Sequence, residues 1–142
     1  MASVIAVCTS SRRGTTKTAC SEVLLIRNHG IQGDAHAGKW HRQVSLLALE
    51  STEKMKNTLP DLRAGAFAEN ILTEGICLHS LEIGTQLQVG DAVLEVTQIG
   101  KECHSDCEIR RLVGDCVMPR EGIFTRVLKG GMVHVGDEIK VL

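Results

Sequence analysis

Short stretches in which apolar and polar residues alternate run through this chain of 142 residues, and this pattern is typical of β-strands. The clearest examples are residues 84–100 and 131–142, each of which alternates around a Gly-Asp pair. Glycine as the first residue of a two-residue turn suits a type II′ hairpin. The Val-Gly-Asp string recurs 46 residues apart in these segments, through either duplication or shared turn chemistry. We therefore expect each segment to form a hairpin.

The rest of the chain adds strands and one helix. Glu50 and Glu53 precede two lysines in residues 50–59, and Pro60 follows, so this segment is the best helix candidate. Residues 44–49 are either a buried strand or the entry to that helix, and the state of residues 64–76 is left open. Further strands are predicted at 2–8, 22–28 and 121–131. Many short strands, frequent glycine and one helix predict a mainly β barrel or sandwich in a single domain, residues 1–142.

Composition and charge exclude several classes of function. The 16 basic and 17 acidic residues nearly cancel, and two Phe, one Trp and no Tyr cannot supply a stacking platform for nucleic acid. No segment approaches the ~18 consecutive apolar residues of a membrane span, and the amino terminus does not resemble a signal peptide. We therefore expect a cytoplasmic protein that binds neither nucleic acid nor membrane, with reduced cysteines.

Six cysteines divide into two groups. Cys8 and Cys20 lie in apolar, strand-like surroundings, and Cys77 lies in a short apolar stretch. These three are predicted to be small buried core residues. The other three fall within 14 residues, directly after a predicted strand, so their thiols are expected at a sheet end. They are Cys103, Cys107 and Cys116.

Three interpretations of this thiol cluster compete. With His104, the three cysteines could complete a zinc site, although the C-x3-C spacing departs from that of common zinc motifs. Alternatively, one cysteine is reactive or ligates another metal, since Lys101 and His104 flank Cys103 and cations favour the thiolate. The third interpretation is three ordinary thiols in a loop. Residue order alone does not rank the three cysteines.

A glycine- and histidine-rich segment, residues 29–43, fits no regular element and is predicted to be a long, shaped loop. His36 and His41 are five residues apart, unlike the i, i+4 pair of a helical zinc site. Lys39, His41 and Arg42 could bind an anion such as a phosphate. A solvated basic turn is the alternative explanation.

Four blocks of sequence resemble a known family. They read GDAHAGKWHRQVSLL, GAFAENILTEGI, LQVGDAVLEVTQIGKEC and GIFTRVLKGGMVHVGDEI, at residues 33–47, 65–76, 87–103 and 122–139. In this order they are similar to a stand-alone MOSC domain, named for the carboxy-terminal domain of molybdenum cofactor sulfurase. The resemblance implies a closed, mixed β-barrel of the pyruvate-kinase-barrel type with a few short helices.

The resemblance also implies a role around the molybdenum (or tungsten) pterin cofactor or its precursors. Family members are proposed to hold the cofactor, or to accept sulfur on a cysteine from a pyridoxal-phosphate-dependent cysteine desulfurase and pass it to a molybdoenzyme. In relatives that reduce N-hydroxylated compounds with a separate electron donor, a cysteine ligates molybdenum. The corresponding position here is Cys103, with Cys107 as the runner-up and Cys116 as a feature of small members.

A phosphorylated pterin needs cationic partners, and arginine grips a phosphate through two hydrogen bonds. The residues that the resemblance and this chemistry together nominate for the cofactor are Arg42, Arg120 and Arg126, with Lys101, His36 and His104 behind them. Three functions follow as hypotheses: a domain that binds the cofactor or carries sulfur, a molybdenum-dependent reductase, and a zinc-stabilised module without catalytic activity.

Overall fold

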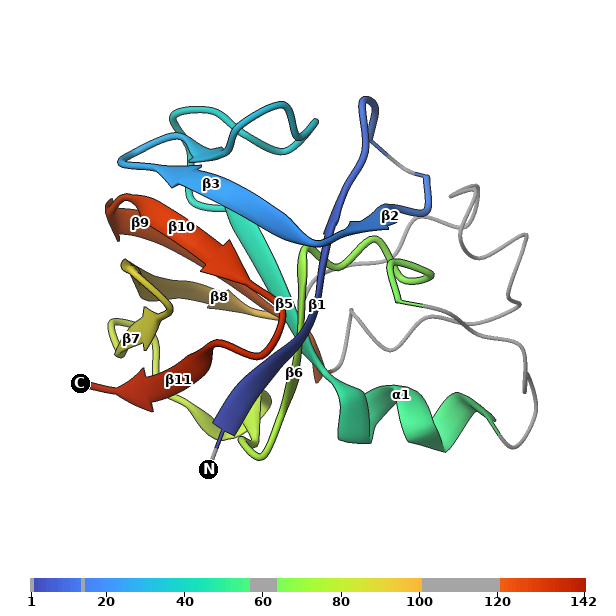
Figure 1. Ribbon diagram of the computed structural model, residues 1–142. Helices are drawn as coiled ribbons and strands as arrows, with labels where there is room; N and C mark the ends of the chain where they lie inside the picture. The colour runs from blue at the N-terminus through green and yellow to red at the C-terminus, as the bar shows by residue number, and fades with distance from the viewer. Residues whose placement is uncertain (1, 14, 57–63, 101–120) are drawn as a thin grey trace.

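A closed β-barrel forms the centre of the computed structural model, which describes residues 2–13, 15–56, 64–100 and 121–142 (Figure 1). Seven strands are hydrogen-bonded in a ring, in the order β1, β11, β7, β8, β9, β5, β6 and back to β1. The strands of this ring are β1 (Ala2–Thr9), β5 (Val44–Ala48), β6 (Ile71–Glu74), β7 (Gln86–Val89), β8 (Ala92–Ile99), β9 (Ile123–Lys129) and β11 (Glu138–Val141). This ring confirms the predicted closed barrel.

The barrel is mixed because β5 and β6 run parallel, with Leu46 opposite Ile71, whereas the other ring pairs are antiparallel. Parallel neighbours need a long crossover connection. Helix α1 (Leu49–Lys56) begins this connection and confirms the helix predicted after β5. The last residues of the predicted helix, 57–59, lie outside the described part of the chain. No helix in the described residues is long and apolar enough to cross a membrane.

A second, three-stranded sheet packs beside the barrel and corrects one prediction. Strand β10 (Gly131–His134) does not form a hairpin with β11 but pairs with β3 (Glu22–Ile26), which also pairs with β4 (Gly30–Ile31). Strand β11 instead lies between β7 and β1 and closes the ring (Figure 1). Alternation fixes which residues share a face but not which strand they pair with, so this expected hairpin was wrong. The expected β7–β8 hairpin, around Gly90-Asp91, is confirmed.

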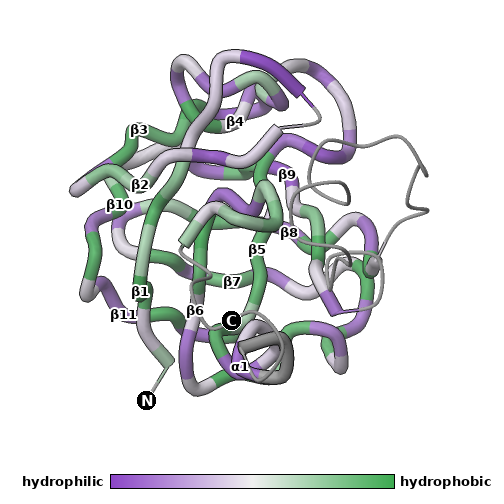
Figure 2. Tube along the Cα trace, turned by 90° about the vertical axis from the view of Figure 1, so that its right-hand side faces the viewer, coloured by the Kyte–Doolittle hydropathy of each residue, from purple (hydrophilic) through white to green (hydrophobic). Residues whose placement is uncertain are grey.

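Strand β5 is buried on both faces, which explains its continuous apolar sequence. Val44, Leu46 and Ala48 pack into the barrel interior. Leu47, on the opposite face, packs in a second cluster outside the barrel, together with Phe67. Figure 2 shows the apolar positions along β1, β5 and β7, whereas the loops above β3 and β4 are mostly hydrophilic.

The cysteine predictions are confirmed for one residue of three. Cys8 is fully buried in the outer cluster, where burial raises the pKa of its thiol to about 12. Cys20, on the short strand β2 (Thr18–Cys20), and Cys77, which follows β6, are both exposed. Apolar neighbours in the sequence did not reveal that β2 is a solvent-facing edge strand, or that the chain leaves the barrel before Cys77.

Residues 64–70 cover the outer cluster through buried polar contacts. The Asn70 side chain accepts a hydrogen bond from the Ser45 N–H at 3.0 Å and donates one to the Cys8 carbonyl at 3.1 Å. The Glu69 carboxylate accepts the Gly65 N–H at 2.8 Å. Burial raises the pKa of Glu69, although the N–H groups of Gly65 and Phe67 oppose that shift. This segment is therefore held against β5 and β1.

Gly65→Ala should destabilise the fold more than Gly84→Ala. Both glycines have positive φ, +88° and +97°, but a Cβ at residue 65 would overlap the Lys17 backbone oxygen, whereas residue 84 has open space. We expect losses in unfolding free energy of about 3 and about 1 kcal/mol, respectively, by urea titration. Equal losses would show that the contact with Lys17 does not constrain this segment.

Candidate functional site

A buried ion pair organises the loops beside the barrel. The Lys17 ammonium, just before β2, lies 2.8 Å from the Asp34 carboxylate in the long loop, and neither side chain is exposed. Lys17 also contacts the Ser10 hydroxyl at 3.0 Å and the His36 Nδ1 at 3.1 Å. Asp34 accepts the backbone N–H groups of Ser10 and His36, both at 3.1 Å. The pair therefore ties residues 10–17 to residues 34–36.

The surroundings of this pair keep the Asp34 carboxylate charged. Burial alone would raise the pKa of Asp34, but Lys17 and the N–H groups of Ser10 and His36 outweigh it, so that pKa lies below its usual value. Burial lowers the pKa of Lys17, and the charge of Asp34 only partly restores it. Each group therefore depends on the other to remain charged in a dry environment.

A group of aromatic and cationic side chains continues from the ion pair through His36. The Trp40 indole Nε1–H donates to the His36 carbonyl at 2.7 Å. The Trp40 and His36 rings lie within 2° of parallel, with their centroids 6.4 Å apart. The Arg13 guanidinium lies 4.5 Å from the Trp40 ring centroid, which is a cation–π distance. The Arg13 Nε–H also donates to the Ala35 carbonyl at 3.4 Å. These contacts arrange one guanidinium, one indole and one imidazole on the same surface.

Arg42 extends this surface towards the end of β8. Its Nε–H donates to the Gln98 side-chain oxygen at 3.0 Å, and its guanidinium lies 5.2 Å from the Phe124 ring centroid. His41 Nε2 contacts the same Gln98 oxygen at 2.8 Å. The Gln98 amide in turn donates to the Gly100 carbonyl at 2.7 Å. Gln98 therefore fixes Arg42 and His41 beside the point where the chain enters residues 101–120. We call Arg13, His36, Trp40, His41 and Arg42 the basic surface.

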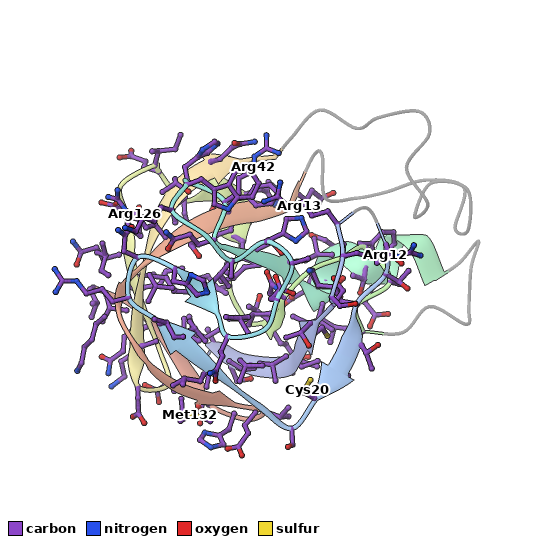
Figure 3. All side chains as sticks on the ribbon, turned by 90° about the horizontal axis from the view of Figure 1, so that it is seen from above. Arg12, Arg13, Cys20, Arg42, Arg126 and Met132 are labelled. Carbon is purple, nitrogen blue, oxygen red and sulfur yellow. The ribbon has the colours of Figure 1, made fainter. Side chains whose placement is uncertain are left out.

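Arg126, which was predicted to bind the cofactor, lies apart from the basic surface. It lies on the outer face of β9, where it forms an ion pair with Glu95 at 2.6 Å and lines a separate hollow of about 570 Å³ with Arg27 and Asn28. Seen from above, Arg126, Arg42, Arg13 and Arg12 follow one another across one side of the molecule, whereas Cys20 and Met132 lie on the other side (Figure 3). His36 and Arg42 therefore belong to one loop, and Arg126 lies at the far end of the row.

Six predicted site residues lie outside the described part of the chain, so their roles stay predictions. The described chain on either side of residues 101–120 is joined, because the Gly100 N–H donates to the Gly122 carbonyl at 2.7 Å. Within the described ranges, no group of three or more His, Cys, Asp and Glu side chains is placed to hold a metal ion. The six residues are Lys101, Cys103, His104, Cys107, Cys116 and Arg120.

Sequence reasoning missed Arg13, Trp40 and Gln98, as well as the ion pair below them. Arg13 was part of a polar loop with no motif, and Trp40 is a single aromatic residue between basic ones. Gln98 is 56 residues from Arg42, so only strand pairing reveals that they meet. The polar composition of residues 9–19, with two adjacent arginines, was the one signal that could have found part of the surface.

Lys17→Met should leave the Asp34 carboxylate buried without its cation and lower the unfolding free energy by about 3 kcal/mol at pH 7. The stabilisation from a carboxyl with a depressed pKa is complete above its unfolded pKa of about 3.9 and is lost as the pH falls through the lower folded value. The difference between wild type and variant should therefore shrink below about pH 4.

Urea titrations between pH 3 and 7 measure this difference, and the double variant Lys17→Met/Asp34→Asn is the control. Because the double variant removes both charges, it should recover part of the stability at pH 7. A loss that is the same at every pH would contradict the ion-pair explanation.

Comparison with known proteins agrees with this architecture. Several solved structures align with nearly the whole chain. Among them are YuaD from Bacillus subtilis (19% identity, TM-score 0.81, 99% of this chain and 96% of that one), YiiM from Geobacillus stearothermophilus (17% identity, TM-score 0.77, 100% and 75%) and YiiM from Escherichia coli (19% identity, TM-score 0.73, 100% and 70%). No curated protein matches the chain. The family model of the MOSC domain matches residues 33–140. The chain therefore belongs to the MOSC domain family, which is generally associated with the molybdenum cofactor.

Proposed function

We propose that this protein binds a molybdenum (or tungsten) pterin cofactor on the basic surface and holds its metal, or a transferable sulfur, through Cys103. The observation that carries the proposal is the Arg13 guanidinium 4.5 Å from the Trp40 ring, beside a loop that also presents Arg42. This combination offers positive charge for a phosphate and flat rings for a planar heterocycle. Family membership supports the same ligand class.

The chemistry of the described residues fits the phosphorylated pterin. Arg13 and Arg42 would bind the phosphate, because a guanidinium presents paired N–H donors to anionic oxygens. The Arg42 Nε–H donates to Gln98, and the Arg42 guanidinium lies over the Phe124 ring. These two contacts orient the guanidinium. Trp40 and His36 would pack against the pterin ring, and the Trp40 N–H is already held by a backbone carbonyl.

The sulfur ligand would come from residues 101–120. Cys103 follows Gly100 by three residues, and Gly100 accepts the hydrogen bond from Gln98, the same side chain that fixes Arg42. A thiolate is a soft ligand suited to molybdenum and to persulfide chemistry. When bound, the cofactor would supply a metal with sulfur ligands that exchanges oxygen or sulfur atoms. A pyridoxal-phosphate-dependent cysteine desulfurase would be the sulfur donor and a molybdoenzyme the client.

Loss of the guanidinium groups should weaken cofactor retention. The variant Arg13→Ala/Arg42→Ala, purified anaerobically from a host that makes the cofactor, should retain about tenfold less pterin than wild type, because two charge-assisted contacts are lost. Arg27→Ala is the matched control, since Arg27 lies on the separate hollow with Arg126. Fluorescence of the released, oxidised pterin measures the content. If wild type and both variants retain the same amount, the basic surface does not bind the cofactor.

Replacement of Cys103 should distinguish the proposed sulfur ligand of the cofactor from a ligand of a structural zinc site. Cys103→Ser should lose bound molybdenum and persulfide, while its unfolding free energy, from urea titration, stays within about 0.5 kcal/mol of wild type, because a thiol that binds a ligand need not stabilise the fold. Elemental analysis and persulfide labelling measure both quantities. Stoichiometric zinc in the purified protein, together with unfolding of Cys107→Ser, would instead identify a structural zinc site.

A further inference from the structure

A second group of reactive side chains surrounds a hollow of about 450 Å³ where β5 and β6 end. Ser51 reaches the hollow from the first turn of α1, Cys77 and His79 from the segment after β6, and Glu121 from the residues just before β9. These elements are far apart in the sequence, and the ring of strands brings them together. None of these residues belongs to the basic surface.

The geometry of this hollow places a thiol, a base and a carboxylate in sequence. The Cys77 Sγ lies 3.9 Å from both nitrogens of the His79 ring. The His79 Nδ1 lies 3.9 Å from the Glu121 Oε1, and the same oxygen accepts a hydrogen bond from the Ser51 hydroxyl at 2.8 Å. This order corresponds to a nucleophile, its base and a group that orients the base. Such contacts commonly tighten when a substrate enters.

The local fold fixes the thiol and the imidazole on the same side. Leu78, between them, is fully buried in the barrel core and anchors the short 3-10 helix Leu78–Ser80. Cys77 is the residue before this helix, and its carbonyl accepts the Ser80 hydroxyl at 2.8 Å. With Leu78 pointing inward, both flanking side chains are exposed to solvent.

We infer that Cys77 is a reactive thiol that exchanges with low-molecular-weight disulfides, with His79 as its base and Glu121 as the residue that positions His79. The thiol proton passes to a His79 ring nitrogen, and the Cys77 sulfur attacks one sulfur of the disulfide. A Cys77–S–S–R bond forms while the original S–S bond breaks. Cys77 is oxidised to the mixed disulfide, and the leaving half is reduced and takes the proton from His79.

The charge around the hollow indicates which disulfides enter. Its described lining carries two carboxylates, Glu50 and Glu121, and no lysine or arginine. Glu50 is held in place by the Gly75 N–H at 2.8 Å. A cationic disulfide such as cystamine should therefore react faster than the anionic disulfide of glutathione, and added salt should reduce the difference.

The chain contains its own reference thiols. Cys20 is also exposed, but the structure places it 3.7 Å from the Thr9 hydroxyl and 3.7 Å from the Thr18 carbonyl, and no imidazole among the described residues contacts it. Cys8 is buried, and burial raises the pKa of its thiol to about 12, so it should react only when the protein unfolds. Reaction at Cys8 therefore reports loss of the fold within the same experiment.

The test follows mixed-disulfide formation at each cysteine of the full chain with cystamine at pH 7, by peptide mass spectrometry. Cys77 should react about tenfold faster than Cys20 in the wild type. His79→Gln should slow Cys77 to within about twofold of Cys20, and Glu121→Gln should slow it about threefold, while Cys20 keeps its rate. His134→Gln, which changes an exposed histidine elsewhere, should leave Cys77 unchanged.

Two results would overturn the inference: equal rates at Cys77 and Cys20 in the wild type, or a Cys77 rate that His79→Gln does not alter. Protection of Cys8 in each variant shows that the fold is intact, so a slower Cys77 cannot be attributed to unfolding. Because the test measures neither pterin nor molybdenum, its failure would leave the proposed cofactor surface untouched.

Discussion

The buried ion pair between Lys17 and Asp34 decides the shape of the surface on which the proposed function rests. It joins the turn after β1 to the loop before β5, and both segments lie outside the barrel strands. Because a buried charge is stable only with its partner, the two segments remain in place together. The backbone around Asp34 then positions His36, whose carbonyl holds Trp40. Electrostatics inside the protein thus determines where an aromatic ring is presented outside it.

The barrel explains why both sites lie on loops. Its interior is filled by apolar side chains from every strand of the ring. Part of its outer face is also covered, by residues 64–70 and the cluster around Phe67. Binding and reactive groups are therefore left to the segments that leave the strand ends, which a rigid scaffold holds in place.

Strand β5 connects the two sites. Arg42 precedes it by two residues, and Ser51 follows it in the first turn of α1, so the basic surface and the thiol hollow lie at opposite ends of one strand that is buried on both faces. The described groups differ in charge, with arginines on the basic surface and two carboxylates around the thiol hollow. The same short segment thereby separates a surface suited to a phosphate from a hollow suited to a neutral or cationic molecule.

The sequence by itself determined most strands, the first helix and the closed barrel, because alternation and turn residues are local signals and the four family blocks are written in order along the chain. It also nominated His36 and Arg42, which the structure places in the loop that carries the basic surface. Only the tertiary structure decided that β10 leaves the barrel, that Gln98 meets Arg42, and that Cys77 is exposed beside His79. Each of these depends on which distant segments become neighbours, and a pattern of period two contains no information about partners.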